Sequence, residues 1–302
     1  MIWTQWSDLV MPAHAVHLTT DGIGPKEEDL PKITFYVPRY MGGKAALEVI
    51  PRMTSLKVVQ SPNAGVDDIL EVLPVGVTLC NAAGVHDAST AELAIGLTIS
   101  ARRGFAQFAK DQANEMWSHK TNNSLADSRV GIVGHGNIGK LIAKQLENFS
   151  VEVIPFTRRG QDGSQLISEF DRLLPTLDVV ILILPLTAES YHFMSRNRLA
   201  LMKDGSVLIN VARGSIVDTQ ALIDELQSGR LSAGLDVTDP EPLPKGHPLW
   251  KAPNVIITPH VGGDTTAFES RGRKLVEDQI QRWVNREELI NVVSGPTLPD
   301  FA

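Results

Sequence analysis

The sequence predicts an α/β fold with parallel sheets, which two observations support, and its length predicts the number of domains. Short β-branched runs alternate with longer helical patterns from Ile33 to the end of the chain, which is typical of parallel strands joined by crossover helices. Most of the apolar runs are continuous rather than alternating, as expected for strands covered on both faces. The length of 302 residues, with 43% hydrophobic content, suggests about two domains with substantial cores.

The individual elements follow from these runs and from their spacing. The expected strands are 33–37, 56–60, 130–134, 151–156, 179–184, 206–211 and 255–259. Apolar residues at helical spacing predict helices over 90–117, 139–149, 219–228 and 267–289. The first 30 residues show no clear strand, and for Trp3 and Trp6 in that segment we expect core packing or a dimer contact.

The composition argues against several classes of function. A formal net charge of −7 disfavours nucleic-acid and anionic-membrane partners, which need a clustered positive field. With Cys80 as the single cysteine, no intramolecular disulfide or thiol-rich metal cluster can form, and we expect a buried apolar role for it. No apolar run reaches the ~18 residues that span a bilayer, and the N-terminus lacks a basic region followed by an apolar stretch, so we expect a cytoplasmic protein. We also expect no metal site.

The segment VGIVGHGNIG, residues 130–139, predicts a dinucleotide site. A bare G-x-G-x-x-G is weak evidence, but here it follows an apolar strand and opens a helix. Gly134 permits a tight turn, Gly136 lets the backbone approach a pyrophosphate, and Gly139 allows close helix–strand packing. Asn137 and Ile138, at the start of the helix, offer amides and partial positive charge to the phosphates. A purely structural glycine turn would not explain this context.

The end of the next strand decides between NAD and NADP. An acidic residue there would bond the ribose 2′-hydroxyl and repel a 2′-phosphate. Here the strand VEVIPF runs into Thr157, Arg158 and Arg159, with no carboxylate at that end. Arginine makes bidentate contacts with phosphate, so we expect NADP(H), with NAD(H) as the alternative if the arginines are merely solvated.

Three further residues form a set suited to reducing a 2-keto acid. Such a reduction needs a cation to hold the carboxylate and polarise the ketone, and an acid to protonate the alkoxide as hydride arrives. Arg213, Glu241 and His260 supply these groups after successive apolar strands, with Glu241 keeping His260 protonated. Taken singly, each could be a surface ion pair, a solvated loop residue or a core histidine.

The order and spacing of these segments identify a family. The matching segments are VGIVGHGNIG, LPLTAES from Leu184, LINVARGSIVD from Leu208, GLDVTDPEPLP from Gly234 and NVIITPH from Asn254. Over nearly its whole length, the chain resembles the D-isomer-specific 2-hydroxyacid dehydrogenases. The resemblance assigns the catalytic arginine, glutamate and histidine of that family to Arg213, Glu241 and His260.

The resemblance also implies contacts with the cofactor and the substrate. Asp236 is expected at the nicotinamide end of the cofactor, and Ala212 and the turn from Pro185 to Thr187 along its path. In SPNAGVDDI, the backbone amides of Ala64 and Gly65 are expected to bind the substrate carboxylate, which suits an amide pair.

The resemblance implies two doubly wound parallel-sheet domains with the active site in the cleft between them. Residues 92–264 would form a Rossmann cofactor domain, inserted into a smaller flavodoxin-like substrate domain made of residues 1–91 and 265–302. Members are usually homodimers joined through cofactor-domain helices, which suits the apolar helix from Ala91 to Ile99.

The substrate and some alternatives remain open at this point. Arg39 and Tyr40 are candidates for substrate recognition, with Arg39 suited to a phosphate or a second carboxylate, and His86 could reach the cleft or cap a helix. The chain ends at Ala302 without space for a regulatory domain, which favours glyoxylate or hydroxypyruvate over a phosphoglycerate dehydrogenase-like activity.

The formate dehydrogenase branch is disfavoured because it typically has glutamine in place of Glu241. A dinucleotide-sensing protein like the family's corepressor members is the alternative from another class.

Overall fold

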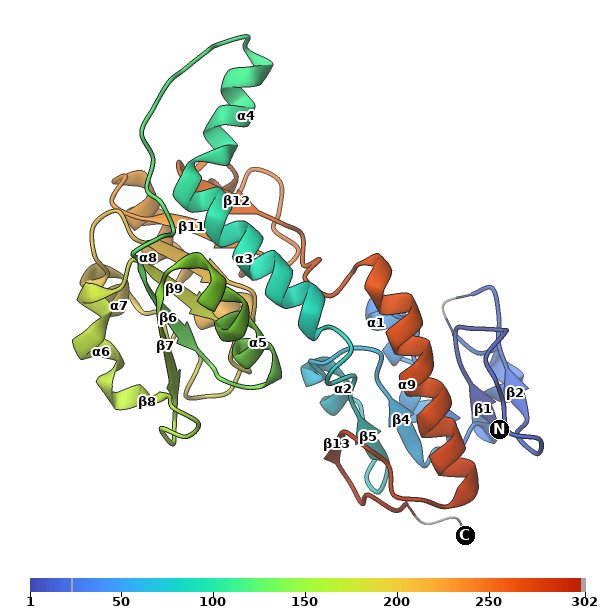
Figure 1. Cartoon of the computed structure of the whole chain (residues 1–302). Helices are drawn as coiled ribbons and strands as arrows, with labels where there is room; N and C mark the ends of the chain where they lie inside the picture. Colours follow the sequence, from blue (N-terminus) through green and yellow to red (C-terminus); the bar gives the residue numbers. More distant parts are fainter. Residues whose placement is uncertain (23, 300–302) are drawn as a thin grey trace. The chain divides into compact units, whose positions relative to one another are not determined.

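The computed structural model describes residues 1–22 and 24–299 and divides into two compact units (Figure 1). Unit 1 consists of Met1–His86 and Thr266–Ala302, and unit 2 consists of Asp87–Thr265. Unit 2 is therefore inserted into the chain of unit 1. A boundary after residue 91 would cut helix α3 (Asp87–Arg103), whereas the division between the units falls at the first residue of that helix.

Unit 2 is built on a seven-stranded sheet in which every pair of neighbouring strands is parallel. Its strands are β6 (Arg129–Val133), β7 (Glu152–Thr157), β8 (Gln165–Leu166), β9 (Val179–Leu182), β10 (Val207–Asn210), β11 (Ser232–Leu235) and β12 (Val255–Ile257). The spatial order is β12-β11-β10-β9-β6-β7-β8. This is the Rossmann order with a seventh strand added at one edge. Glu241 was expected to follow a strand, but no bounds were predicted for β11, because its sequence SAGL carries no β-branched residue.

The sheet of unit 2 is buried on both faces. Val180 and Leu182 belong to one apolar cluster, and Val179 and Ile181 of the same strand belong to another. The helices are α3, α4 (Phe105–Ala113), α5 (Asn137–Leu146), α6 (Phe170–Leu173), α7 (Arg196–Leu201) and α8 (Thr219–Gln227). Short 3-10 turns lie at Glu147–Phe149, Ile167–Glu169, Leu174–Thr176, Gly214–Ile216 and Pro248–Lys251. The predicted arrangement of parallel strands between covering helices is confirmed.

The prediction of a single long helix over 90–117 is wrong. The chain forms α3 and α4 instead, separated by Gly104 in the left-handed region at φ +68°. This conformation ends the helix, and glycine adopts it without steric cost. After the break, α4 projects from the rest of unit 2, and an extended segment returns the chain to β6 (Figure 1).

Unit 1 contains a six-stranded sheet in the order β13-β5-β4-β3-β1-β2. The strands are β1 (Ile2–Trp3), β2 (His17–Leu18), β3 (Phe35–Tyr36), β4 (Val58–Gln60), β5 (Thr78–Cys80) and β13 (Val292–Ser294). The helices are α1 (Gly43–Leu47), α2 (Asp67–Leu70) and α9 (Thr266–Asn285), with 3-10 turns at Glu27–Lys32 and Ile50–Arg52. The first five strands are parallel in the flavodoxin order, and β13 is antiparallel at the edge beside β5.

The expectation that the first 30 residues lack a strand is wrong. Strands β1 and β2 lie there, but each has two residues, too few to show a periodic pattern. Trp3 is fully buried with its ring 5.3 Å from that of Tyr36, and Trp6 is buried against Phe268 at 6.1 Å. Core packing, one of the two roles expected for these tryptophans, is thus observed.

The expected role of the single cysteine is confirmed. Cys80 is fully buried in β5, and burial raises the pKa of its thiol to about 12. It is therefore a small apolar core residue at neutral pH. None of the helices in residues 1–22 and 24–299 is long and apolar enough to cross a membrane.

Candidate active site

The predicted site residues of unit 2 follow the carboxyl ends of its strands. Because all seven strands are parallel, these ends lie at one edge of the sheet, where ligands bind in open parallel sheets. The residues are Gly134 after β6, Thr157 at the end of β7, Pro185 after β9, Ala212 and Arg213 after β10, Asp236 after β11 and His260 after β12. The topology thus gathers side chains that lie more than 100 positions apart in the sequence.

The glycine loop is fixed by close backbone contacts. Gly134 has φ +105°, and a Cβ at this position would overlap the carbonyl oxygen of Ile183. A Cβ at Gly139 would overlap the carbonyl oxygen of Gly134, whereas Gly136 faces open space. The Lys140 N–H makes the first helical bond, to the Gly136 carbonyl at 2.9 Å, so the amides of Asn137 and Ile138 ahead of it lie at the helix end that attracts anions.

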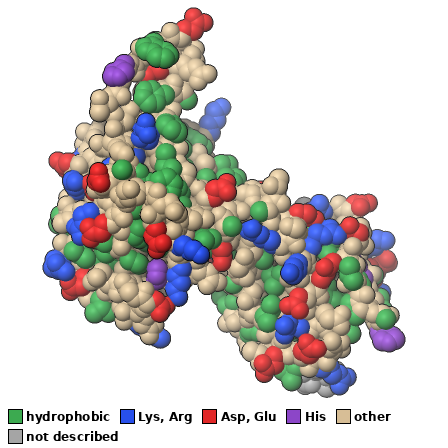
Figure 2. Space-filling model, in the orientation of Figure 1, with side chains coloured by type: hydrophobic (Ala, Val, Ile, Leu, Met, Phe, Trp, Pro, Cys, Tyr) green, Lys and Arg blue, Asp and Glu red, His purple; other side chains and the backbone are tan. Residues whose placement is uncertain are grey.

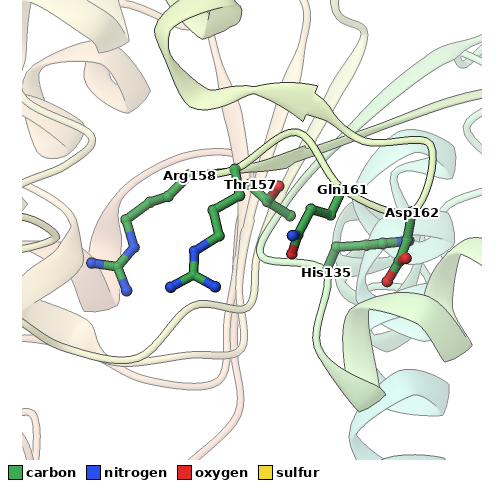
Figure 3. Close-up of a pocket in the computed structure, with 6 residues that line it drawn as sticks. His135, Thr157, Arg158, Gln161 and Asp162 are labelled. Atoms are coloured by element: carbon green, nitrogen blue, oxygen red, sulfur yellow. The ribbon is translucent and has the colours of Figure 1, made fainter.

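A cavity of about 230 Å³ lies between the glycine loop and the end of β7 (Figure 3). It is lined by His135, Thr157, Arg158, Arg159, Gln161 and Asp162. Both arginine side chains are exposed. The Thr157 hydroxyl accepts from the Gly160 N–H at 3.0 Å and bonds the Ser164 hydroxyl at 2.7 Å, so it shapes the loop that borders the cavity.

Three residues of this cavity, His135, Gln161 and Asp162, were not singled out from the sequence. Asp162 comes five residues after the end of β7, beyond the position where an acidic residue is usually sought, and it is paired with Lys140 at 2.7 Å. His135 stands between the first two glycines of the motif, a position the motif leaves unspecified. A carboxylate at any position of the loop after this strand, and not only at its first residues, is the sequence signal that indicates Asp162.

The turn after β9 and the residue after β10 are held by local hydrogen bonds. The Ser190 hydroxyl donates to the Pro185 carbonyl at 2.7 Å and accepts from the Thr187 N–H at 2.7 Å. Ala212 is buried, and its N–H donates to the side chain of Asn210 at 3.1 Å. Each of these residues therefore has a defined position at the edge of the sheet.

Glu241 and His260, 19 residues apart, meet at this edge. His260 Nδ1 lies 2.5 Å from Glu241 Oε1, and both side chains remain partly accessible at 44% and 39%. Arg213 is close enough for its charge to act on the pKa of both residues, and its Nη1 donates to the Ala212 carbonyl at 2.7 Å. A Cβ at Gly214 would overlap the Thr238 carbonyl oxygen, so this glycine lets the Arg213 loop approach the Glu241 loop.

The electrostatics of the pair favour a protonated histidine. The hydrogen bond to Glu241 raises the pKa of His260 above its ordinary value of 6.5, and burial and Arg213 oppose this effect without cancelling it. Burial acts to raise the pKa of Glu241, but the bond and charge of His260 outweigh it, so that pKa lies below its ordinary value. These shifts favour an imidazolium paired with a carboxylate, and in that state the second ring nitrogen of His260 can donate a proton.

Asp236 holds the loop that carries His260. Its buried carboxylate accepts from the Thr258 hydroxyl at 2.6 Å and from the N–H groups of Val261 and Gly262, both at 2.9 Å. The His260 N–H donates to the Asp236 carbonyl at 2.8 Å, and His260 itself has φ +54°. A non-glycine residue in this region stores backbone strain and persists only where its surroundings fix it. These contacts give Asp236 a supporting role that the sequence did not indicate.

In unit 1, the loop after β4 is fixed by its carbonyl groups. His86 Nε2 bonds the Pro62 carbonyl at 2.8 Å, the Ala82 N–H donates to the Asn63 carbonyl at 2.9 Å, and Asn81 Nδ2 donates to the Ala64 carbonyl at 2.8 Å. Three successive carbonyls thus bond to residues 81–86. Among the residues described, the amides of Ala64 and Gly65 find no protein acceptor. An adjacent amide pair of this kind suits an anion.

The other candidates of unit 1 are placed as follows. Arg39 is exposed and donates to the Gly22 carbonyl at 2.9 Å. The ring of Tyr40 stacks on Phe268 at 3.8 Å, and the ring of His86 stacks on Phe268 at 5.4 Å. The side chain of His86 is buried and bonds the Pro62 carbonyl of the loop after β4, and the two roles expected for it, reaching a cleft or capping a helix, stay predictions.

The model of the family described as "D-isomer specific 2-hydroxyacid dehydrogenase, NAD binding domain" matches residues 95–262, more than half of the chain. The match contains the glycine loop and all three residues Arg213, Glu241 and His260.

The chain belongs to the D-isomer specific 2-hydroxyacid dehydrogenase family.

Relatives with curated names agree with this membership. A D-3-phosphoglycerate dehydrogenase of Methanocaldococcus jannaschii is 32% identical over 269 residues, which cover 85% of this chain and 51% of the relative. The chain therefore spans about half the length of that enzyme. A glyoxylate reductase of Thermofilum pendens is 34% identical over 247 residues, covering 77% of this chain and 73% of the relative.

Among solved structures, a D-isomer specific 2-hydroxyacid dehydrogenase of Xanthobacter autotrophicus Py2, in complex with NADPH and MES, matches with a TM-score of 0.77. It is 28% identical, and the match covers 93% of this chain and 91% of that one. The matching family model describes the NAD binding domain of 2-hydroxyacid dehydrogenases, so this chain is a member of a nicotinamide-dependent oxidoreductase family that acts on 2-hydroxy acids. Within residues 1–22 and 24–299, no group of three or more His, Cys, Asp or Glu side chains is placed to hold a metal ion.

Proposed function

We propose that this protein reduces a small 2-keto acid to the D-2-hydroxy acid with NADPH, and that glyoxylate or hydroxypyruvate is its preferred substrate. The observation that carries the proposal is the 2.5 Å contact between His260 and Glu241. It lies within electrostatic reach of Arg213, at the sheet edge that also holds the glycine loop. This arrangement supplies an acid, an orienting carboxylate and a cation together.

The chemistry assigned to each residue follows from its charge. A nicotinamide bound at this edge would supply a hydride to the carbonyl carbon, and the carbonyl oxygen would then carry negative charge. The His260 imidazolium delivers the proton that this oxygen needs and becomes neutral. Glu241 holds the ring through Nδ1 and keeps the opposite nitrogen protonated. The Arg213 guanidinium binds the substrate carboxylate and stabilises the developing alkoxide.

The residues of unit 2 fit a dinucleotide. A side chain at Gly134 or Gly139 would collide with backbone, and the open space beside Gly136 permits close approach of a pyrophosphate. Pro185, Thr187, Ala212 and Asp236 are proposed to line the path of the cofactor toward its nicotinamide end. The Asp236 carboxylate accepts three hydrogen bonds from the loop that carries His260. A carboxylate has about four acceptor sites, so it can accept one more hydrogen bond.

The preference for NADP(H) rests on the cavity at the end of β7. Arg158 and Arg159 line it and are exposed, so both guanidiniums are accessible to a 2′-phosphate. Thr157 shapes the same loop through its hydroxyl. The Xanthobacter structure with NADPH supports this preference, and the "NAD binding domain" description of the matching family model is compatible with either cofactor.

The substrate carboxylate is proposed to bind the amides of Ala64 and Gly65, because the fixed carbonyls of Pro62, Asn63 and Ala64 orient this loop. Arg39 is proposed as a selectivity residue, whose guanidinium would favour substrates with a second anionic group. The glyoxylate reductase of Thermofilum pendens supports a small keto acid. A phosphoglycerate dehydrogenase-like activity is the second candidate, supported by the Methanocaldococcus relative, of which the chain covers 51%.

We also propose a homodimer joined through helices of unit 2. The apolar stretch from Ala91 to Ile99, expected to form this contact, is mostly buried within the unit, with Ala91 and Ala94 fully so. A group of exposed apolar side chains lies instead on α4 and just after it: Phe105 at 48%, Phe108 at 38%, Met116 at 56% and Trp117 at 98%. Hydrophobic side chains are visible on this projecting segment in Figure 2. Exposed apolar clusters of this kind mark interaction surfaces.

A panel of 2-keto acids assayed with NADPH and with NADH tests the function directly. We expect turnover of glyoxylate or hydroxypyruvate with a higher kcat/KM for NADPH. A preference for NADH would contradict the cofactor assignment alone. Tight cofactor binding without turnover of any keto acid would favour a dinucleotide sensor. Light scattering on a size-exclusion column tests the dimer, and Trp117→Ser should shift the mass toward that of a monomer.

A further inference from the structure

The cofactor cavity of unit 2 combines two arginines with a carboxylate. Asp162 lines the cavity beside Arg158 and Arg159, on the loop between β7 and β8. In Figure 3, Asp162 and His135 lie toward the helical side of the cavity, and Arg158 reaches away on the other side. Among the described residues that line the cavity, Asp162 is the one carboxylate.

Lys140 forms an ion pair with the Asp162 carboxylate, although Lys140 itself does not line the cavity. It stands in the first turn of α5, and its Nζ donates to Asp162 Oδ2 at 2.7 Å. The pair is exposed, with 51% and 64% of the two side chains accessible, so it contributes little to folding stability. Its main consequence is therefore the charge of the cavity rather than the stability of the fold.

The histidine of the cavity does not add a cation. Burial lowers the pKa of His135, and the charge of Lys140 lowers it further, with Asp162 opposing. His135 is therefore neutral near pH 7. The charge that a ligand meets in this cavity is then set by Arg158, Arg159 and the state of Asp162.

We propose that Lys140 is a specificity-determining residue for the cofactor, because its pairing with Asp162 lets the cavity accept a 2′-phosphate. A bare carboxylate would repel this dianion by Coulomb interaction across a few ångströms. Without Lys140, Asp162 would also become free to accept a hydrogen bond from a ribose 2′-hydroxyl, which is how an acidic residue selects NAD(H). The inference rests on the proposed function of this cavity as a cofactor site and names the residue pair that sets its selectivity between NADPH and NADH.

The test measures dissociation constants of NADPH and NADH for the full-length protein, in low and high salt. Lys140→Met should weaken NADPH binding about 5- to 10-fold and leave NADH binding within about twofold or tighter. The effect should shrink in high salt, because the pair is exposed. Lys144→Met, one turn further along α5 and also exposed, removes the same charge and should leave both constants within about twofold.

A double-mutant cycle separates the proposed route from a direct contact. In the background of Asp162→Asn, the substitution of Lys140 should change the NADPH-to-NADH ratio less than about twofold, because no carboxylate remains to be neutralised. An equal shift in both backgrounds would overturn the proposal and place Lys140 directly on the phosphate. An unchanged ratio in Lys140→Met would overturn it as well. Lys140→Gln serves as a second variant if the methionine variant melts at a lower temperature than the parent.

These outcomes remain distinct from a failure of the proposed function. The binding ratio shifts relative to its own starting value, whichever cofactor the parent protein prefers. Absence of keto-acid turnover, or a parent preference for NADH, would refute the proposed function without deciding the role of Lys140.

Discussion

Two loops of this protein are suited to anions, and they are held in opposite ways. The glycine loop of unit 2 takes its shape from contacts so close that a methyl group at Gly134 or Gly139 would overlap a carbonyl oxygen. The loop of unit 1 takes its shape from hydrogen bonds that residues 81–86 donate to the carbonyls of Pro62, Asn63 and Ala64. The first loop is therefore sensitive to added atoms, and the second is sensitive to lost donors.

Of the changes in the two loops, adding one methyl group to the glycine loop is expected to have the largest effect. Gly139→Ala should weaken NADPH binding by at least about 100-fold and lower the melting temperature, because backbone must move to admit the Cβ. Gly136→Ala faces open space and is the matched control for folding. It should keep the melting temperature and lose about 10-fold in affinity, because its methyl meets only the cofactor. Titration of protein fluorescence with NADPH and thermal unfolding measure both effects, and parental affinity in Gly139→Ala would contradict this view of the loop.

Glu241→Gln tests whether the catalytic pair depends on charge. Reduction needs protonated His260, so activity is present below the pKa of this residue and is lost as the pH rises through it. Since Glu241 raises that pKa, its replacement should move the alkaline limb of the kcat/KM profile to lower pH. Oxidation of the hydroxy acid needs neutral His260, and its acid limb should move in the same direction. A pH profile identical to that of the parent would show that Glu241 does not raise the pKa of His260.

The smallest effect is expected from removing a donor from the loop of unit 1. His86→Ala should raise the KM for the keto acid about 3- to 10-fold, with kcat and the NADPH dissociation constant nearly unchanged, because one of three anchoring bonds is lost. His86→Gln keeps a donor and should recover part of the lost affinity. If kcat falls while KM stays the same, the loop does not bind the substrate in its ground state.

The same contrast explains what could be predicted from the sequence. The strand, the glycines and the helix at 130–139 are contiguous, so their spacing alone indicates the loop that the structure contains. The contacts of His86 and the pairing of Lys140 with Asp162 join segments about 22 to 24 residues apart, and no local pattern signals them. Sequence reasoning named Glu241 and His260 as partners, and the structure brings them together at 2.5 Å.

Other differences have equally local causes. The bounds of β11 were not predicted because SAGL lacks β-branched residues, and β1 and β2 were missed because two residues show no period. The prediction of one helix over 90–117 was wrong at Gly104. Apolar residues keep a helical spacing on both sides of this glycine, and the sequence does not reveal its left-handed conformation. Periodicity therefore predicts the type of an element better than its ends.

The measurement that tests the central claim most directly is the turnover of glyoxylate and hydroxypyruvate by His260→Ala at saturating NADPH. If His260 is the proton donor, kcat should fall by about 10²- to 10⁴-fold while the NADPH dissociation constant stays at the parental value. Near-normal turnover with unchanged cofactor binding would contradict the assignment and require another acid at this edge of the sheet.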